Sequence, residues 1–157
     1  MHNLEYIHTD DISELKGFFC GVYEMDFFIQ KSMQRVLDTN KDLRNYIVKE
    51  NNIPVALCTL KVYDMPLSDR YTFLRTEYIE YLAVRRESQC NGVGRQILEW
   101  IESNTSSDIK HIVVDAFISD VTSYTAVPFY KKCGFKAIQN KHPMAETVRM
   151  IKTLKKQ

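Results

Sequence analysis

The chain has 157 residues, of which 45% are hydrophobic and 26% are charged, and its formal net charge is +1. This length suits one core of ordinary size, so we expect a single domain over residues 1–157. A charge so close to neutrality does not indicate a protein that holds nucleic acid through its overall balance. Only the stretch from Pro128 onward is strongly basic, with eight Lys or Arg residues against one acid, Glu146.

The cysteine and histidine content gives no sign of a metal. The four cysteines form no C-x-x-C pair, and the four histidines show no ligand spacing beside them. The opening residues are polar, unlike a signal peptide, and no apolar run approaches the roughly 20 residues that span a bilayer. We therefore expect a cytoplasmic protein with reduced thiols and no membrane contact.

The N-terminal part of the chain predicts one strand and two helices. Residues 4–7 form a short strand. A helix from Asp10 or Asp11 to Phe19 is expected next, because a short acidic side chain accepts hydrogen bonds from the free amides of a first turn. Between residues 24 and 38, apolar side chains recur at spacings of three, four and seven, which predicts one amphipathic helix.

The middle of the chain predicts a hairpin, a loop and a strand followed by a helix. Residues 44–50 and 54–63 alternate and are rich in β-branched and aromatic side chains, with turn residues between them, so we expect a hairpin. The pattern breaks over residues 64–76, which we interpret as a loop that selects substrate. Residues 78–84 then alternate as a strand, and helical spacing begins at Val93.

The last part of the chain predicts a buried strand, a short helix and two closing strands. Residues 111–117 are almost continuously apolar, as expected of a strand covered on both faces. A short helix starting near Thr125 and stopped at Gly134 follows, with Pro128 in its first turn because proline lacks an N–H. Strands are expected at 135–138 and 147–154. Helices between strands predict an α/β fold or a mixed sheet with helices on both sides.

The link before the helix at Val93 is polar and reads QCNGVG over residues 89–94, with Arg95 in the first turn. A helix begins with unpaired N–H groups at the positive end of its dipole, where an anion is stabilised. Gly92 and Gly94 would leave room for a phosphate. Alternatively, the two glycines only allow strand and helix to pack closely. The spacing matches neither a P-loop nor a Rossmann loop.

Residues 89–94 resemble (Gln/Arg)-x-x-Gly-x-(Gly/Ala), the signature with which the GNAT superfamily of N-acetyltransferases binds the pyrophosphate of acetyl-CoA. The segment 123–135 is similar to the later N-x-x-A-x-x-F-Y-x-x-x-G-F motif of that family. Ser123 stands where the family usually has Asn, and the matching residues are Ala126, Phe129, Tyr130, Gly134 and Phe135. The resemblance covers most of the chain, and these two blocks carry its specificity.

The resemblance implies a mixed, mainly antiparallel sheet flanked by helices on both faces, with splayed central strands. It also implies that amides between Gln89 and Arg95 hold the pyrophosphate and that the backbone of residues 82–84 pairs with the pantetheine arm. The expected cofactor-binding residues are Leu82, Ala83, Val84, Gln89, Cys90, Asn91, Gly92, Val93, Gly94, Arg95, Ser123, Ala126 and Phe129.

Acetyl transfer needs a neutral amine, a polarised thioester carbonyl and a proton for the departing thiolate. Tyr130 is the expected acid because of its place in the family motif. A tyrosine beside Phe129 and Phe135 can also be a core residue with no part in catalysis. Glu80 is the expected base, with Glu77 or a chain of waters as alternatives. We expect direct transfer, because no histidine lies near Cys90 or the other cysteines in sequence to activate a thiol.

The segment 18–28 bears on the acceptor. It resembles the F-x-C-G-x-x-x-L-D-x-F opening of acetyltransferase toxins, which modify the amino group of charged tRNA, with Met25 in place of Leu. The same residues also suit a helix break at Gly21 followed by core aromatics. A tRNA-acting enzyme needs a basic surface. The candidates for it are Lys131, Lys132, Lys136, Lys141, Arg149, Lys152, Lys155 and Lys156.

We therefore expect a bacterial, acetyl-CoA-dependent N-acetyltransferase that works without a metal on a primary amine of a small molecule or macromolecule. One alternative is a toxin that acetylates aminoacyl-tRNA, with tRNA as its partner. Another is a non-catalytic CoA-binding sensor, and a third is a fold that serves assembly only. A homodimer is a candidate assembly.

Overall fold

The computed structural model describes residues 1–67, 69, 71–119, 124–138 and 146–155. Two single turns of 3-10 helix, at Ser13–Leu15 and Arg86–Ser88, accompany the regular elements. Those elements are β1 (Leu4–His8), α1 (Tyr23–Lys31), α2 (Met33–Thr39), β2 (Arg44–Glu50), β3 (Ile53–Pro66), β4 (Phe73–Val84), α3 (Val93–Asn104), β5 (His111–Phe117), α4 (Val127–Lys132), β6 (Lys136–Ala137) and β7 (Thr147–Thr153).

The strands follow the order β1-β2-β3-β4-β5-β7-β6 in one mixed, mainly antiparallel sheet. Contacts divide the chain into two compact units, formed by residues 1–60 with 80–97 and by residues 61–79 with 98–157. The chain passes between them within β3, β4 and α3. In the described part of the chain, no helix is both long and apolar enough to cross a bilayer.

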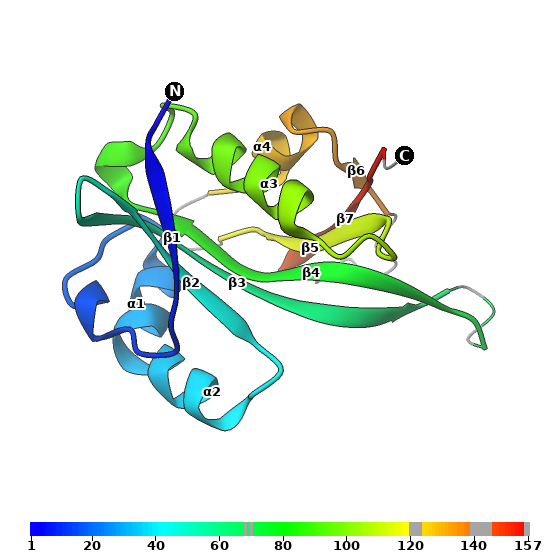
Figure 1. The fold of residues 1–157 in the computed structure, drawn as a ribbon, viewed down its shortest axis with the longest axis horizontal. Coiled ribbons are helices and arrows are strands. Elements are labelled where there is room, and N and C mark those ends of the chain that lie inside the picture. The colour runs from blue at the N-terminus through cyan, green and yellow to red at the C-terminus, as the bar shows by residue number, and fades with distance from the viewer. Residues whose placement is uncertain (68, 70, 120–123, 139–145, 156–157) are drawn as a thin grey trace. The chain divides into compact units, whose positions relative to one another are not determined.

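The first unit is built on the antiparallel strands β1, β2 and the first half of β3. Figure 1 shows β1 alongside β2, with α1 leading directly into α2. The predicted hairpin is confirmed: Asn51 and Asn52 connect β2 to β3 with φ values of 52° and 64°, a left-handed pair that suits a two-residue hairpin turn. The most deeply buried side chains of this unit include Met33, Leu37, Ile47, Val48, Leu57 and Ile97.

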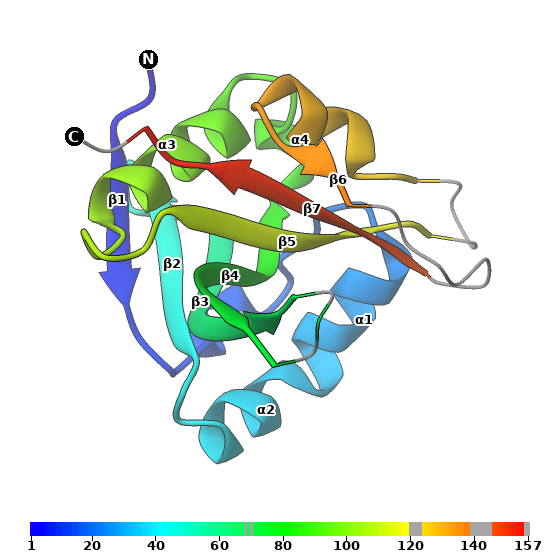
Figure 2. The ribbon, with the colours of Figure 1, turned by 90° about the vertical axis from the view of Figure 1, so that its right-hand side faces the viewer.

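The second unit contains the only parallel pairing in the described sheet, between Glu77–Ile79 of β4 and Ile112–Val114 of β5. Antiparallel β7 follows β5 along its whole length, and Figure 2 shows short β6 beyond β7, next to α4. The continuous apolar run of β5 is explained by burial, because Ile112, Val113 and Ala116 have no exposed surface. The predicted strand 111–117 is thereby confirmed.

The predicted helix from Asp10 or Asp11 to Phe19 is wrong. The Asp11 carboxylate accepts a hydrogen bond from the Ser13 amide at 2.9 Å, but the N-cap residue is Ile12, and only the 3-10 turn Ser13–Leu15 follows. Gly17 then takes a left-handed φ of 79°, which a helix cannot continue through. The acidic side chain does bind a nearby free amide, as expected, but neither the predicted cap position nor the predicted helix is present.

The predicted single helix over residues 24–38 is two helices. Ser32 separates α1 from α2 with a φ of −130°, far from the helical value, although its amide still donates to Phe28 at 2.9 Å. Serine is a poor residue for a helix interior because its hydroxyl competes for backbone groups. The apolar spacing persists across the break, since Ile29, Met33 and Leu37 are all buried, and it therefore hid the interruption.

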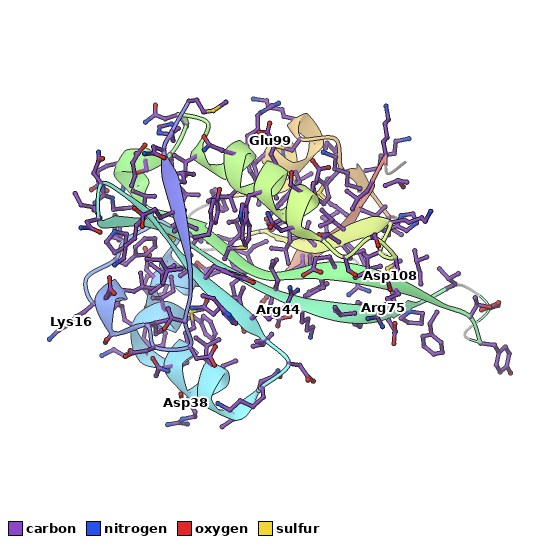
Figure 3. All side chains as sticks on the ribbon, in the orientation of Figure 1. Lys16, Asp38, Arg44, Arg75, Glu99 and Asp108 are labelled. Atoms are coloured by element: carbon purple, nitrogen blue, oxygen red, sulfur yellow. The ribbon has the colours of Figure 1, made fainter. Side chains whose placement is uncertain are left out.

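The predicted loop over residues 64–76 is mostly strand. β3 runs to Pro66 and β4 starts at Phe73, so residues 64–66 and 73–76 belong to strands. Between the two strands, the Asp69 carboxylate accepts hydrogen bonds from the amides of Tyr71 and Thr72 and from the Thr72 hydroxyl. Further along the hairpin, Figure 3 labels Arg75 and Asp108, whose side chains form an exposed ion pair with 3.3 Å between Nε and the carboxylate oxygen. Such a pair contributes little to stability.

Candidate active site

The link between β4 and α3 has the backbone geometry of an anion cradle. Cys90 and Gly92 adopt left-handed φ values of 62° and 86°, and the Gly92 carbonyl accepts the first hydrogen bond of α3, from Gln96 at 3.0 Å. The amides of Gly92 and Gly94 make no hydrogen bond within the described residues. Alternating left- and right-handed residues at the start of a helix turn such amides toward one point, where a phosphate oxygen can accept from them.

Gln89 has a role that the sequence did not reveal. Its side-chain amide donates to the carbonyl of Val84 at 2.8 Å and to the carbonyl of Cys20 at 2.5 Å, and its main-chain amide donates to Arg86 at 3.2 Å. These donors are engaged inside the protein. The Gln89 side chain therefore ties the link to the end of β4 and to the segment 18–28, and the available amides begin after it.

The segment 18–28 forms a structured turn against this link. The two oxygens of the Asp26 carboxylate accept hydrogen bonds from the Cys20 amide at 2.7 Å and the Gly21 amide at 3.1 Å. The Arg86 amide donates to the Phe19 carbonyl at 3.0 Å. Burial raises the pKa of the Cys20 thiol to about 12, so this cysteine is a packing residue and not a nucleophile.

A pocket of about 450 Å³ opens beside the first two turns of α1. Three of its aromatic side chains are exposed, Phe19 by 47%, Tyr23 by 57% and Phe27 by 55%, which is unusual for large rings placed so close together. The pocket thus presents an apolar surface on the same unit as the link. Its lining consists of Phe19, Gly21, Tyr23, Asp26, Phe27, Gln30 and Lys31.

The predicted base and the predicted pantetheine-binding residues lie at the end of β4. Glu80 is half-buried there, and neighbouring Tyr81 stacks on Phe28 with ring centroids 4.7 Å apart. Burial, and then the charge of Glu80, raise the pKa of Tyr81. Leu82 and Val84 are half-buried and Ala83 is buried. Glu77, the alternative base, is 2% exposed and belongs to the other unit.

The predicted acid lies in α4 of the second unit. Tyr130 is 5% exposed, and its ring packs edge-on against Phe129 at 5.0 Å and Phe135 at 5.3 Å between centroids. As predicted, Pro128 lies in the first turn of this helix, which Ala126 caps. Ser123 lies outside the described residues. The ring packing accounts for the aromatic residues of the motif and leaves the role of the hydroxyl as a prediction.

The second unit also holds a polar cluster that the sequence did not suggest. The Asp115 carboxylate accepts hydrogen bonds from Arg149 at 2.9 and 3.0 Å and from the Tyr78 hydroxyl at 2.6 Å. Burial favours a high pKa for Asp115, but these donors outweigh it and hold the pKa below its usual range. Such pairing depends on which strands lie side by side, which the linear pattern does not contain. No metal-binding group of side chains occurs in the described ranges.

The family model described as an acetyltransferase (GNAT) domain matches residues 41–137, more than half of the chain. The chain belongs to the GNAT acetyltransferases. Membership confirms the fold class and the enzymatic activity expected from the sequence, acetyl-CoA-dependent N-acetyl transfer. The matched region contains the β4–α3 link of this GNAT domain and all of α4.

Several solved structures resemble this GNAT domain in fold. A mutant of the AtaT toxin, bound to the C-terminus of the antitoxin AtaR and to acetyl-CoA, has a TM-score of 0.75 and 22% identity, covering 98% of this chain and 93% of its own. The KacTA–DNA complex has a TM-score of 0.71 and 18% identity, and the match covers 98% of this chain and 94% of its own. An acetyltransferase from Thermus thermophilus has a TM-score of 0.69 and 16% identity, and the match covers 98% of this chain and 100% of its own. No curated protein sequence matches the chain significantly.

The double hydrogen bond of Gln89 leads to a stability prediction. Replacing Gln89 with Leu removes both donors and should lower the free energy of unfolding by about 1–2 kcal/mol. Replacing it with Glu should cost more, because a carboxylate would face the carbonyl oxygens of Val84 and Cys20. Urea unfolding of the parent protein and both variants measures whether their stability falls in this order. Equal stability of Gln89→Glu and the parent protein would contradict these contacts.

Proposed function

We propose that this GNAT domain holds the pyrophosphate of acetyl-CoA on the amides of Gly92 and Gly94 and passes the acetyl group directly to a primary amine. The observation that carries the proposal is the pair of unengaged amides in a left-handed turn at the start of α3. Donors that are fixed before the ligand arrives cost no reorganisation when they bind it.

In the proposed reaction, the neutral amine attacks the thioester carbonyl, so that a C–N bond forms and the C–S bond breaks. Tyr130 supplies the proton that the departing thiolate takes up, since a phenol can protonate a thiolate within hydrogen-bond distance. The proton that the amine loses passes to Glu80 or to water. Neither residue becomes covalently attached to the acetyl group.

The test is release of free CoA thiol from acetyl-CoA across a panel of acceptors: small amines, peptide N-termini, lysine side chains and aminoacyl-tRNA. Thiol release that depends on an acceptor supports the proposal. A protein that binds CoA and releases no thiol with any acceptor would instead be a CoA-binding sensor. A protein that binds neither CoA nor acetyl-CoA would contradict the cradle.

The amino group of aminoacyl-tRNA is the acceptor that specific observations favour. The toxin-like segment 18–28 contacts the link through the bonds of Cys20 to Gln89 and of Phe19 to Arg86. Toxins are also among the proteins that share this fold. The basic residues support this acceptor only in part. Arg149 forms an ion pair with Asp115, and Lys152 forms one with Glu102 at 2.8 Å. Exposed side chains remain at Lys131, Lys136 and Lys155. Lys141 and Lys156 lie outside the described residues.

If tRNA is the substrate, reversing these exposed charges should weaken its binding. We expect Lys131→Glu combined with Lys136→Glu to raise KM for aminoacyl-tRNA by about tenfold at low salt, because each phosphate contact that is lost removes a counterion-release contribution. KM for acetyl-CoA should be unchanged. The difference in KM for aminoacyl-tRNA between the parent protein and the double variant should shrink as the salt concentration is raised. A KM for aminoacyl-tRNA that does not depend on salt would contradict docking on Lys131 and Lys136.

A further inference from the structure

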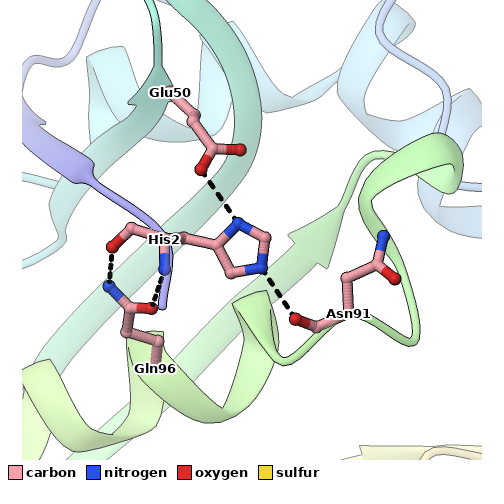
Figure 4. A network of polar contacts seen from close by, with 4 residues as sticks. All are labelled: His2, Glu50, Asn91 and Gln96. Carbon is pink, nitrogen blue, oxygen red and sulfur yellow. Dashed lines mark hydrogen bonds and ion pairs between the residues drawn. The ribbon is translucent and has the colours of Figure 1, made fainter.

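His2 is joined to the β4–α3 link although it lies before β1. Figure 4 shows its ring between two partners: Nδ1 lies 2.9 Å from the carboxylate of Glu50, and Nε2 lies 2.7 Å from the carbonyl oxygen of Asn91. The backbone of His2 is also fixed, because its amide donates to the Gln96 side chain at 3.1 Å and its carbonyl accepts from that side chain at 2.6 Å. His2 therefore connects β2, α3 and the link.

The two ring partners of His2 define its protonation. A carboxylate and a main-chain carbonyl have no hydrogen to donate, so each ring nitrogen must supply one. A neutral imidazole carries a single N–H and satisfies only one of the two acceptors. Both contacts are hydrogen bonds only when the ring is an imidazolium ion.

The bond to Asn91 acts on the cradle through one peptide group. In a planar trans peptide, the carbonyl of Asn91 and the amide of Gly92 point in opposite directions. Holding that carbonyl toward His2 therefore fixes the direction of the Gly92 amide, which has no other hydrogen bond among the described residues. Without His2, no hydrogen bond in the described part of the chain would hold the direction of this peptide.

We propose that His2 is a positioning residue, whose imidazolium holds the Asn91–Gly92 peptide so that the Gly92 amide presents its hydrogen to the pyrophosphate of acetyl-CoA. The proposal rests on the proposed function, because it requires this link to bind the pyrophosphate. It makes the affinity for acetyl-CoA fall when His2 loses its proton, through a residue that touches neither ligand nor reacting atoms.

The direction of the pH dependence follows from the groups around the ring. The Asn91 carbonyl, and then Glu50, raise the pKa of His2 above its ordinary value of 6.5, against the effects of burial and of the Met1 amino group. Gln96, facing His2 from α3, is uncharged. A raised pKa means that the clamp is fully formed below pH 6.5 and is lost as pH rises through the pKa of the folded protein. The affinity for acetyl-CoA should therefore decrease as the pH rises above 6.5 and through the pKa of His2 in the folded protein.

The test is calorimetric titration of the full chain with acetyl-CoA at a series of pH values from about 6 to about 9, with any purification tag placed at the C-terminal end. We expect the Kd of the parent protein to rise about two- to fivefold with pH, the range of an exposed ionic contact. His2→Ala should show the weaker Kd at every pH. The 3′-phosphate of the ligand titrates alike with all variants, so the difference between curves reports on His2.

Two further variants separate positioning from stability. Glu50→Gln keeps an acceptor but removes a negative charge, and it should move the midpoint of the pH dependence to lower pH. His8→Ala is the matched control, since His8 is the last residue of β1, the strand that follows His2, and its ring stacks on Tyr46 with centroids 5.1 Å apart. It should keep the parent curve. Urea unfolding at each pH shows that the variants are folded.

Coincident curves for the parent protein and His2→Ala, with acetyl-CoA still bound, would overturn the clamp and leave the cradle intact. An unmoved midpoint in Glu50→Gln would also overturn it, because the charge would then have no influence on the titrating group. Absence of acetyl-CoA binding at every pH would overturn both the clamp and the proposed function. That result is recognisable because the parent protein itself fails.

Discussion

Replacing Tyr130 with Phe should lower the turnover number by about 100-fold, because a positioned general acid typically contributes about 10²- to 10⁴-fold to a rate. The change removes one oxygen atom. It keeps the ring that packs edge-on against Phe129 and Phe135. The affinity for acetyl-CoA should change by less than about twofold, since the hydroxyl acts on the departing thiolate and not on the bound ground state. Steady-state thiol release, together with calorimetric titration of acetyl-CoA, measures both quantities.

A packing control distinguishes loss of the acid from loss of structure. Phe135 is 3% exposed and contacts the same ring, so Phe135→Leu should destabilise the protein by about 1 kcal/mol while lowering turnover only a few-fold. If Tyr130→Phe and Phe135→Leu reduce turnover equally, Tyr130 is a core residue. Unchanged turnover in Tyr130→Phe would remove the hydroxyl from the mechanism altogether.

Replacing Gly92 with Ala should raise the Kd for acetyl-CoA by about tenfold or more. Gly92 has a φ of 86°, and a left-handed backbone costs a residue with a Cβ about 1–2 kcal/mol, which corresponds to roughly a factor of ten. The cost can be relieved only by turning the peptide that carries the binding amide. Apart from its chain neighbours, the new methyl group meets no atom of the described residues within 4 Å, so it would project into the space that the ligand is proposed to use.

Gly17 provides a matched control for this strain. Its φ is 79°, and a Cβ added there also meets nothing within 4 Å, but it follows the 3-10 turn Ser13–Leu15 and not the β4–α3 link. Both alanine variants should lose about 1–2 kcal/mol of unfolding free energy. Only Gly92→Ala should lose affinity for acetyl-CoA. Equal affinities in the two variants would show that the phosphates do not bind at the link.

Most strands were predictable from the sequence because their patterns are local. The alternation of β2, the apolar run of β5 and the turn at Asn51 and Asn52 each depend on neighbouring residues alone. The errors arose where local signals were ambiguous. Asp11 accepts a hydrogen bond from a free amide beside a single turn as readily as it would cap a longer helix. The spacing of Ile29, Met33 and Leu37 is the same with or without a break at Ser32.

The candidate site was predictable to the extent that backbone conformation is encoded by glycine. Gly92 marked the left-handed turn, and the family resemblance supplied Tyr130 and the ligand. The side-chain bonds that hold the link were not predictable, because Gln89 reaches Cys20 and His2 reaches Asn91 across sequence separations of 69 and 89 residues. Such pairs appear only when the strands are assembled. Their polar side chains looked like solvent-facing or ligand-binding residues in the linear sequence.

The hydrogen bonds between the segment 18–28 and the link end on main-chain carbonyls of the segment: the Gln89 side chain donates to Cys20, and the Arg86 amide donates to Phe19. Within the segment, the Asp26 carboxylate holds the amides of Cys20 and Gly21. The side chains at Phe19, Tyr23 and Phe27 take no part in these bonds. The rings of Tyr23 and Phe27 can therefore be exchanged for other groups without breaking these bonds, whereas the Phe19 ring also lies against the Arg86 guanidinium of the link, with 5.8 Å to the ring centroid. A chimera that imports this stretch from a distant relative should fold provided that it keeps the carboxylate at position 26 and the same backbone trace. In such a chimera, the hydrogen bonds that hold the link stay the same while the exposed apolar surface beside it changes.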